Sequence, residues 1–325
     1  MANLDRGLAH LDKFRAAGGV INGDAIDWNR YLKPDDRSRI VPAESLAEQC
    51  KAEMLLGVDA EPGLTLPWEK THGKVLLRPG KLSVWAGWSR HFKTQILKQL
   101  ALHGMMEGER FLFCSMEEEI RDVWCDMAQI ACLTRDARPA DLNRFTSFIT
   151  QKLWLYDQQG NVEPRRLQAV VRFAAAELKI THVVIDSLMM LALDRDDYDA
   201  QSRFTGELKT TAKDTGAHIH LVAHMRKRDG KGGEDSPGTI HDVSGGHEIG
   251  SKADSVFIVW RDLERRDASR PEVLIKVDKQ RGRVNWRGSI ALNCDAPSRQ
   301  IIDDRLFRFW SERAGYSAAA GEPPL

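Results

Sequence analysis

One stretch of the chain, Leu82–Gly104, constrains the fold more than any other. It begins with the apolar run LSVWA, turns at Gly87, and continues after Lys93 and Thr94 with apolar residues at helical spacing. A strand, a loop, a Lys-Thr pair and a helix in this order are typical of a phosphate-binding loop. The loop N–H groups and the helix N-terminus attract phosphate, the lysine adds positive charge, and the hydroxyl suits Mg²⁺. The stretch therefore predicts a site for a magnesium-bound triphosphate.

Phe92 departs from this pattern, because G-x-x-x-x-G-K-[ST] has glycine immediately before the lysine. A Cβ atom where the loop approaches phosphate, at a backbone position that favours positive φ, costs about 1–3 kcal/mol. The motif alone is weakened by this residue. Whether the loop belongs to a nucleotide site therefore depends on the rest of the chain.

Composition limits the classes of protein to consider. The chain has 325 residues, enough for one large α/β domain with an extension, and its 47 basic and 47 acidic side chains cancel. No overall charge draws the protein to nucleic acid or membrane, so any polyanion site is local. Five scattered cysteines without a C-x-x-C pair fit a reduced compartment. Without a signal-peptide core or a membrane-spanning apolar run, the sequence predicts a cytoplasmic protein with no membrane association.

Short apolar runs alternate with segments of helical periodicity. Besides the strand of the loop motif, strands are expected at Arg110–Cys114, Leu153–Tyr156, Thr181–Leu191, His218–Ala223, Ser255–Trp260, Glu272–Val277 and Ile290–Asn293. Helices are expected after Glu119, at Pro164–Leu178 and at Asp199–Gly216, and a long loop at Met225–Gly246. This alternation predicts an α/β fold, a mainly parallel twisted sheet with helices on both faces.

Three parts are predicted along the chain: a helical N-terminal extension at 1–60, the α/β domain at 61–304, and a partly disordered tail at 305–325. The extension holds two amphipathic stretches, Asn3–Ala17 and Glu44–Leu56, with too few apolar residues for a core of its own. It is either an unattached leader or a linker helix that docks elsewhere, such as on a neighbouring subunit. The sequence does not choose between these two.

Four residues with suitable chemistry follow the expected strands: Lys93, Glu117, Asp186 and His224. Ligands of parallel α/β sheets bind at the carboxyl ends of the strands. Each residue alone is a weak signal, but their coincidence at one edge of the sheet is the strongest indication of a site in this sequence.

Two of these residues are carboxylates with competing interpretations. Asp186 follows Val-Val-Ile, the pattern of a strand that delivers a carboxylate to Mg²⁺. A strand-ending aspartate also caps helices, but the loop motif upstream favours the metal role. Glu117 is expected to orient and partly deprotonate an attacking water. Alternatively, Glu117–Glu119 only supply negative charge at a helix N-terminus, which is the one role expected of Glu118 and Glu119.

Histidines at 218, 220 and 224 share one face of an expected strand, so zinc has to be considered. His218 and His220 lie deeper in the strand and are expected to face packed side chains. No cysteine or carboxylate stands at ligand spacing, and His247-Glu248 lacks the second histidine of H-E-x-x-H. Zinc is therefore not expected, and His224 is interpreted as a sensor that hydrogen-bonds a terminal phosphate.

A basic loop follows that strand. Residues 226–233, RKRDGKGG, gather four cations among glycines. Such a loop can follow a nucleic-acid backbone through charge and main-chain N–H groups, although most charge runs are solvated surface. Its place directly after the strand that ends at His224 favours contact with DNA. The loop contains no aromatic residue for base stacking, so binding is expected to be independent of sequence.

Arg281 in the run Lys279-Gln280-Arg281 has two interpretations. In a ring of subunits it is placed to reach a neighbour's γ-phosphate as an arginine finger. A salt bridge at the rim is the alternative, and from chemistry alone that alternative is favoured.

Taken in order, these motifs resemble the RecA-like motor domain of hexameric replicative DNA helicases, of the phage primase-helicase and DnaB type. The matching stretches are Gly87–Thr94, Ser115–Glu118, Val183–Asp186, Ala223–Lys227, DVSGGHEIGSKADSVFIVWRD and Lys279–Arg281. The resemblance implies that residues 61–304 form a RecA-like P-loop ATPase motor domain. It implies an ATP-dependent helicase, a homo-oligomer in the form of a hexameric ring, that translocates on single-stranded DNA and unwinds duplex.

The resemblance also implies a role for each matching residue, with ATP and Mg²⁺ as cofactors. Lys93 and Thr94 would bind the triphosphate, and Thr94 and Asp186 would hold the metal. Arg261 falls near the position that stacks on the nucleotide base. The other residues implied to contact the nucleotide are Gly87, Ser89, Arg90, His91, Phe92, Gln95 and Lys279.

Catalytic and DNA-binding roles follow from the same resemblance. Glu117 is implied as the catalytic base, His224 as the γ-phosphate sensor and Arg281 as the finger supplied by a neighbour. The residues implied to grip DNA in a central channel are Arg226, Lys227, Arg228, Gly230, Lys231 and Gly232.

Partners and rival functions complete the expectations. A primase or zinc-binding N-terminal domain is missing from the sequence, so a separate primase, polymerase or loader is expected as partner, and a phage-encoded protein acting in a host cytoplasm is compatible with this. Two alternatives stay open. One is a RecA/RadA-like recombination ATPase on the same fold. The other is a ring-forming adaptor whose ATPase activity is impaired by Phe92.

Overall fold

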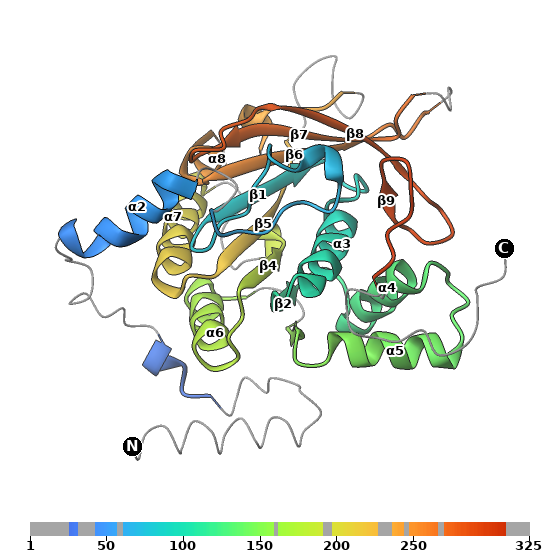
Figure 1. Ribbon diagram of the computed structural model, residues 1–325, viewed down its shortest axis with the longest axis horizontal. Helices are drawn as coiled ribbons and strands as arrows, with labels where there is room; N and C mark the ends of the chain where they lie inside the picture. The colour runs from blue at the N-terminus through green and yellow to red at the C-terminus, as the bar shows by residue number, and fades with distance from the viewer. Residues whose placement is uncertain are drawn as a thin grey trace.

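The computed structural model describes residues 26–31, 43–56, 61–158, 162–190, 197–226, 236–243, 247–265 and 270–309 of the chain. Within them lies a 9-stranded sheet with strand order β3-β2-β4-β5-β1-β6-β7-β8-β9 (Figure 1). The strands are β1 (Leu82–Gly87), β2 (Phe111–Ser115), β3 (Leu153–Asp157), β4 (His182–Asp186), β5 (His218–His224), β6 (Ser255–Arg261), β7 (Val273–Gln280), β8 (Gly288–Cys294) and β9 (Ile301–Ile302).

Helices connect and cover these strands. The α-helices are α2 (Ala47–Leu56), α3 (Lys93–Met106), α4 (Ile120–Cys132), α5 (Pro139–Ile149), α6 (Pro164–Glu177), α7 (Tyr198–Thr215) and α8 (His247–Lys252). Short 3₁₀ segments include η2 (Trp28–Tyr31), η7 (Leu188–Met190) and η8 (Ile240–Asp242). No helix among the described residues is both long and apolar enough to cross a membrane.

The pairing of the strands decides which residues meet at the sheet edge. Strands β3, β2, β4, β5, β1 and β6 pair in parallel, whereas β7, β8 and β9 continue the sheet in antiparallel pairs. Strand β5 separates β1 from β4. The strand before the phosphate-loop motif and the strand ending at Asp186 therefore flank the strand that ends at His224. The prediction of a mainly parallel α/β sheet is confirmed.

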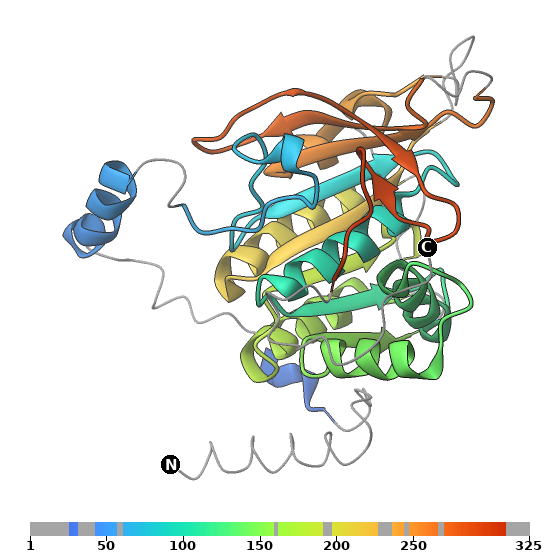
Figure 2. The ribbon, with the colours of Figure 1, turned by 45° about the vertical axis from the view of Figure 1, so that its right-hand side comes forward.

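Side chains alternate along each strand, so the sheet presents two apolar faces, and a layer of helices covers each of them. On β1, Val84 belongs to the apolar cluster formed with α6 and α7, and Trp85 to the cluster formed with α3, α4 and α5. Figure 1 shows α6 and α7 on one side of the sheet and α3 on the other, and Figure 2 shows the same layers from another direction. Parallel strands buried on both faces read as continuous apolar runs, which is why the sequence revealed them.

Some boundaries differ from the expectations. The expected strand at Thr181–Leu191 ends earlier, at Asp186, and η7 follows it. The apolar run continues past the strand end because Leu188 packs into the core from the 3₁₀ turn. Helices α5 and α8 and strand β9 were not predicted. The expected loop at Met225–Gly246 contains η8 and an isolated bridge between Met225 and Val243, while its segments 227–235 and 244–246 lie outside the described residues.

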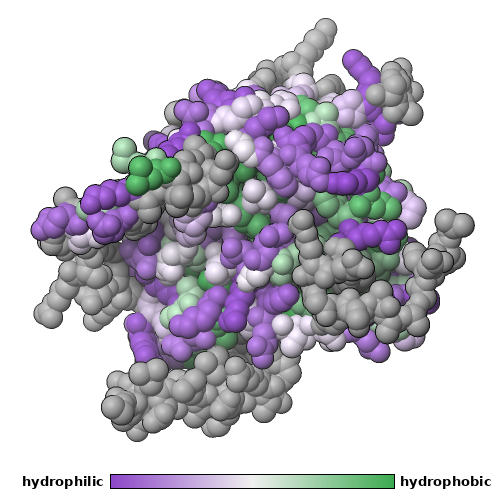
Figure 3. All heavy atoms as spheres, in the orientation of Figure 1, coloured by the Kyte–Doolittle hydropathy of each residue, from purple (hydrophilic) through white to green (hydrophobic). Residues whose placement is uncertain are grey.

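Part of the N-terminal extension contacts the α/β domain. In η2, the Trp28 ring packs edge-on against Phe173 of α6 with centroids 5.9 Å apart, and the Tyr31 hydroxyl donates to Glu177 at 2.9 Å. Helix α2 stands apart from the sheet in Figures 1 and 2, and Met54 and Leu55 on it are 74% and 85% exposed. Figure 3 shows a hydrophobic patch at one end of α2 on an otherwise mostly hydrophilic face. The expected helix at Asn3–Ala17 and the tail beyond residue 309 lie outside the described residues.

Three histidines form a buried hydrogen-bonded stack in the centre of the sheet. The Trp85 indole N–H donates to Nδ1 of His220, so the His220 proton is on Nε2, 3.0 Å from Nδ1 of His182. His218 donates from Nδ1 to the carbonyl of Arg78, and its Nε2 accepts from the Ser83 hydroxyl. In each of these hydrogen bonds the histidine ring is neutral. Among the described residues, no group of histidine, cysteine, aspartate and glutamate side chains could hold a metal ion.

Burial lowers the pKa of all three rings, that of His218 to about 4 and those of His182 and His220 well below 6.5. Neighbouring histidines add to the effect on His182 and His220. The ionisable groups nearest the stack are Glu109, whose carboxylate lies 3.8 Å from His182, and Asp254 and Lys81 beside His218. These do not compensate for the loss of solvation.

The free energy of unfolding is expected to fall as the pH drops below about 6.5, because the unfolded chain then binds protons that the fold excludes. The folded pKa values are depressed, so this stability is present above the unfolded pKa and is lost below it. Three histidines at about 1.4 kcal/mol per pH unit each give a loss of about 4 kcal/mol at about pH 5.5. Urea denaturation at about pH 7.5 and about pH 5.5 measures the difference.

The variant His220→Gln removes one titrating ring, so its slope of stability against pH should be shallower by about one proton. Exposed His241 lies outside the buried stack, so His241→Gln provides the control for a histidine-to-glutamine substitution elsewhere in the chain. Equal slopes in His220→Gln and the wild type would contradict this account.

Candidate nucleotide-binding site

The loop between β1 and α3 adopts backbone conformations that favour glycine. Phe92, the residue before α3, has φ 61° and ψ 18°, and Arg90 has φ 64°. At Gly87 a Cβ atom would lie 2.4 Å from the carbonyl oxygen of Val259 on β6, so only glycine fits there. The chain thus makes the left-handed turn expected of the motif, with phenylalanine in the position of the second glycine.

Contacts with the end of β6 hold Phe92 in this conformation. The guanidinium carbon of Arg261 lies 4.1 Å from the centre of the Phe92 ring, and Glu272 pairs with the same guanidinium at 2.7 Å. The backbone N–H of Arg261 donates to Nδ1 of His91 at 3.0 Å. A cation–π contact contributes about 0.5–2 kcal/mol, which is comparable to the strain of a side chain at positive φ, about 1–3 kcal/mol.

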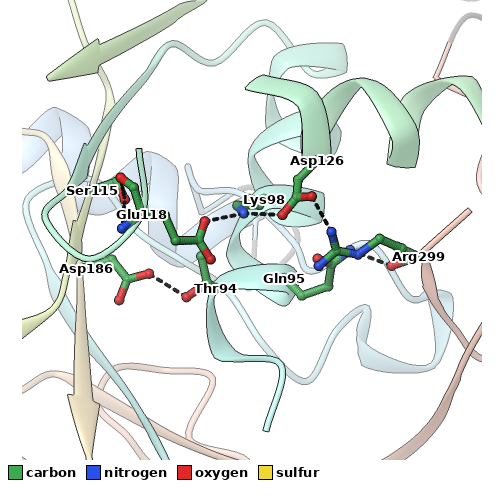
Figure 4. Close-up of polar contacts among 8 residues, drawn as sticks. All are labelled: Thr94, Gln95, Lys98, Ser115, Glu118, Asp126, Asp186 and Arg299. Carbon is green, nitrogen blue, oxygen red and sulfur yellow. Dashed lines mark hydrogen bonds and ion pairs between the residues drawn. The ribbon is translucent and has the colours of Figure 1, made fainter. Parts of the chain in front are cut away.

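Lys93 and Thr94 begin α3 and point back to the loop and to β4. The Lys93 ammonium is buried and donates to the carbonyl of Trp88 at 2.8 Å. Burial lowers its pKa, against the attraction of Asp186 and Glu117. The Thr94 hydroxyl donates to the Asp186 carboxylate at 2.5 Å (Figure 4). This hydrogen bond joins the loop to the end of β4.

Two carboxylates with different environments face each other across this edge. Burial raises the pKa of Asp186 to about 6, with Glu117 and Glu118 adding to the effect and the Thr94 hydroxyl opposing it. Glu117 accepts a hydrogen bond from the Ser187 hydroxyl, and Nε2 of His224 lies 3.3 Å from its carboxylate. The His224 hydrogen bond is the main reason that the pKa of Glu117 is lowered. The structure therefore brings Lys93, Glu117, Asp186 and His224 together.

A buried lysine ties the Glu117 loop to two helices. Lys98 of α3 is 1% exposed and pairs with Glu118 at 2.5 Å and with Asp126 of α4 at 2.6 Å (Figure 4). Arg299, before β9, pairs with the other Asp126 oxygen, and its carbonyl accepts from Gln95 at 2.5 Å. The expectation that Glu118 only supplies charge at a helix N-terminus is wrong, because its carboxylate neutralises a cation inside the fold.

An acidic cleft opens beside this network. It has a volume of about 460 Å³ and is lined by Glu117, Glu118, Glu119, Asp122, Cys125 and Asp126. Its open side exposes the Glu117 carboxylate, which is the condition for a group that acts on water or on an incoming side chain.

The polar atoms of the loop and of the end of β4 show whether a triphosphate and Mg²⁺ would fit this site. Trp88 Nε1 and His91 Nε2 are buried and have no hydrogen-bond partner among the described residues. His91 accepts at Nδ1, and burial lowers its pKa to about 4, so the ring is neutral and Nε2 carries a hydrogen. Both atoms are N–H donors, as an anion requires. Thr94 and Asp186 bring hard oxygen atoms together, as Mg²⁺ requires. The residues present fit both groups.

Of the other residues predicted to contact the nucleotide or its phosphates, some lie at the loop and two lie far from it. Ser89 and Arg90 are exposed on the loop, and Gln95 is buried with its Oε1 unpartnered. Lys279 and Arg281 are not brought to the loop: Gln280 pairs with Ser255, which pairs with Ser83 at the beginning of β1. They therefore lie at the opposite edge of the sheet.

Both of these cations lie at the end of α8. Lys279 donates to the carbonyl of Gly250 at 2.9 Å, and Arg281 donates to that of Ser251 at 3.1 Å. Burial, with Arg281 and Lys209 nearby, lowers the pKa of Lys279 to about 8. The Arg281 guanidinium contacts a carbonyl and not a carboxylate, so among the described residues Arg281 does not form the salt bridge of the alternative interpretation.

The predicted DNA-binding residues are mostly outside the described part of the chain. The backbone N–H of Arg226 donates to the carbonyl of Asp242 at 2.8 Å, next to the bridge between Met225 and Val243. The residues Lys227, Arg228, Gly230, Lys231 and Gly232 lie outside the described residues, so their role stays a prediction.

Several residues of the site were missed from the sequence: Trp88, Lys98, Asp126, Ser187 and Arg299. Helical spacing gave no signal for Lys98, because Leu97 and Leu100 mark a side of α3 that does not include it, and the structure buries nearly every side of this helix. The others lie in loops, except Asp126, which has a partly buried position on α4. No periodicity points from these positions to a partner distant in sequence.

Fold and site together define a P-loop nucleotide-binding domain of the RecA-like class. The family AAA_25, described as "AAA domain", matches residues 65–230 of the 325, and the chain belongs to this family. Two solved structures share the fold. One, the ATPase domain of another protein, superposes with a TM-score of 0.68 at 14% identity, covering 82% of this chain and 100% of that one. The other, a DnaB-like replicative helicase described with its interactions with primase, gives 0.68 at 15%, covering 82% and 69%.

These likenesses confirm the expected RecA-like fold of the DnaB type. Identities of 14% and 15% show the fold alone.

Lys98→Met is expected to lower the free energy of unfolding by about 3 kcal/mol, because it leaves Glu118 and Asp126 without their shared cation inside the fold. Lys51→Met is the matched control, since Lys51 pairs with Glu48 on the surface and should change stability by no more than about 0.5 kcal/mol. Urea denaturation compares the two variants, and equal losses would contradict a structural role for Lys98.

Proposed function

We propose that this protein is an ATP-driven, ring-forming DNA helicase that translocates on single-stranded DNA. The observation that carries the proposal is the convergence of Lys93, Thr94, Asp186, Glu117 and His224 at the carboxyl edge of the sheet. The AAA-domain family and the RecA-like fold support an ATPase. The two similar structures, an ATPase domain and a DnaB-like replicative helicase, support the class of motor.

Each residue has a task that its geometry supports. Lys93, desolvated beside the loop carbonyls, would exchange the Trp88 carbonyl for phosphate oxygens. Thr94 and Asp186 would hold Mg²⁺, which when bound neutralises charge on the phosphates. Glu117, kept ionised by its hydrogen bonds, would orient the attacking water and accept its proton. His224 contacts the same carboxylate and would report the state of the phosphate to the segment that follows it.

Arg281 and Lys279 are proposed to act on the site of a neighbouring subunit. Within one chain they lie at the opposite edge of the sheet, so they cannot complete their own site. A ring of copies would bring this edge to the loop edge of the next copy, with cyclic closure and six subunits by resemblance.

The coupling to DNA would run through the segment after β5. Arg226, Lys227, Arg228, Gly230, Lys231 and Gly232 are proposed to follow the phosphate backbone without reading sequence. A separate primase, polymerase or loader is proposed as partner, because the similar DnaB-like helicase is described with its interactions with primase. Action in the cytoplasm, for a phage or a cell, belongs to the same proposal.

Wild-type protein is expected to bind mant-ATP in the presence of Mg²⁺, and Phe92→Gly is expected to bind it with a Kd within about threefold of the wild type. The reason is that Phe92 already has the backbone conformation that glycine would take. Lys93→Ala, which removes the buried cation, should bind at least about tenfold more weakly. Fluorescence titration measures all three. Binding by Phe92→Gly alone would favour the ring adaptor instead.

Lys93→Ala and Arg281→Ala are each expected to abolish DNA-stimulated ATP hydrolysis and unwinding of a forked duplex. Mixing the two variants should restore part of both activities, because each supplies the residue that the other lacks in a shared site. Absence of any recovery would contradict a finger supplied by the neighbour. Strand exchange between homologous duplexes in place of unwinding would favour the recombination ATPase.

A further inference from the structure

Arg78 is a buried arginine that the nucleotide edge does not use. Its side chain is 9% exposed, and its guanidinium pairs with Glu61 through two nitrogens, at 2.5 Å and 2.9 Å. A further nitrogen, Nη1, donates to the carbonyl of Arg281 at 2.9 Å. A planar guanidinium thus joins a carboxylate on one side to the backbone of the proposed finger on the other.

The turn after β7 is shaped around this guanidinium. Gly282 has φ +124°, a conformation that favours glycine. A Cβ atom at Gly282 would lie 2.3 Å from Nη1 and 2.5 Å from Cζ of Arg78. The guanidinium therefore occupies the space that any other residue at position 282 would need for its side chain.

Gln280, the residue before Arg281, is held by the same segment of the chain. The Gln280 amide donates to the carbonyl of Lys74 at 2.8 Å and accepts from the backbone N–H of Leu76 at 3.3 Å. The segment from Lys74 to Arg78 thus fixes two consecutive residues of the turn. The Arg281 backbone N–H is bonded as well, to the carbonyl of Asp254 at 2.9 Å.

The side chain of Arg281 is held far less firmly than its backbone. Its described hydrogen bond is to the carbonyl of Ser251 at 3.1 Å, at the exposed end of α8. A firmly held backbone with a weakly held, exposed guanidinium is the arrangement expected of a group that leaves its resting contact to reach another molecule.

We infer that Arg78 is a positioning residue for Arg281: it fixes the turn that presents the finger and links that turn to Glu61. The inference rests on the proposed role of Arg281 in a neighbour's site.

The test assigns Arg78 to a complementation group. Arg78→Met should lower DNA-stimulated ATP hydrolysis at least about tenfold, yet bind mant-ATP within about twofold of the wild type. Mixing it with Lys93→Ala should restore activity, because Lys93→Ala subunits carry an intact finger and Arg78→Met subunits an intact loop. Mixing it with Arg281→Ala should restore nothing, because both lack a working finger. General loss of stability would not produce this pattern.

Two further variants make the result decisive. Gly282→Ala places a Cβ atom where the Arg78 guanidinium lies and strains the turn at φ +124°, so it should disturb the presentation of Arg281 and fall in the same complementation group as Arg281→Ala. It provides the test where Arg78→Met fails to fold. Arg172→Met is the matched control, since Arg172 of α6 pairs with Asp214 of α7 at 2.9 Å and is 16% exposed. It should hydrolyse ATP at nearly the wild-type rate.

Two outcomes overturn the inference, and they are distinguishable. If Arg281→Ala recovers with Lys93→Ala but Gly282→Ala and Arg78→Met do not, Arg78 does not act through the finger, and the proposed function stands. If Arg281→Ala itself fails to recover, the finger in trans is wrong and the inference fails with it.

Discussion

The hydrogen bond between Thr94 and Asp186 is the interaction on which the organisation of this molecule depends. It connects the first turn of α3 to the end of β4, across the strand β5 that lies between β1 and β4. Burial raises the pKa of Asp186 to about 6, so near neutral pH the carboxylate is close to the point at which it would take up a proton. A cation at the same place would favour the ionised form. The fold thus keeps the proposed metal-binding carboxylate in an environment that penalises its charge when no cation is present.

Buried charge also explains how the neighbouring loop is held. Lys98 enters the core only because Glu118 and Asp126 neutralise it, and Arg299 in turn balances Asp126. A network of this kind contributes little net stability compared with apolar packing, but removal of one member leaves an uncompensated charge. Its consequence is geometric. The residue next to Glu118 is Glu117, so fixing one carboxylate through α3 and α4 fixes the backbone that carries the other.

The length of the strands keeps the charged groups at the two edges of the sheet apart within one chain. Strand β1 has 6 residues, which at a rise of about 3.3 Å per residue places its first and last residues about 17 Å apart. The loop follows one end, and Lys279 and Arg281 lie beside the other, further than an arginine side chain reaches. Both sets of charged groups can meet only between copies. The proposed closed ring would place opposite edges of identical subunits in contact, so the proposed division of the site between two edges fits cyclic symmetry.

Sequence patterns predicted what depends on periodicity and on strand ends. The strands at β2, β4 and β5 read as apolar runs because both faces are covered, and the residues that follow them converge because parallel strands share one carboxyl edge. The partners of Lys98, the contact of Arg78 with Arg281 and the packing of Trp28 on α6 could not be predicted. Each joins positions separated by long stretches of chain, and neither helical nor strand spacing encodes which distant residue comes near. Phe92 shows how a broken local rule is accommodated: the glycine rule states a backbone requirement, a positive φ, and Phe92 meets it at φ 61°. Its ring lies against Arg261, and the adjacent His91 accepts the Arg261 backbone N–H, so the loop is fastened to the end of β6 at two points. Glycine in this position would remove the backbone strain, but it would also remove the contact between the Phe92 ring and Arg261. The loop therefore remains competent in geometry because its conformation is imposed from β6.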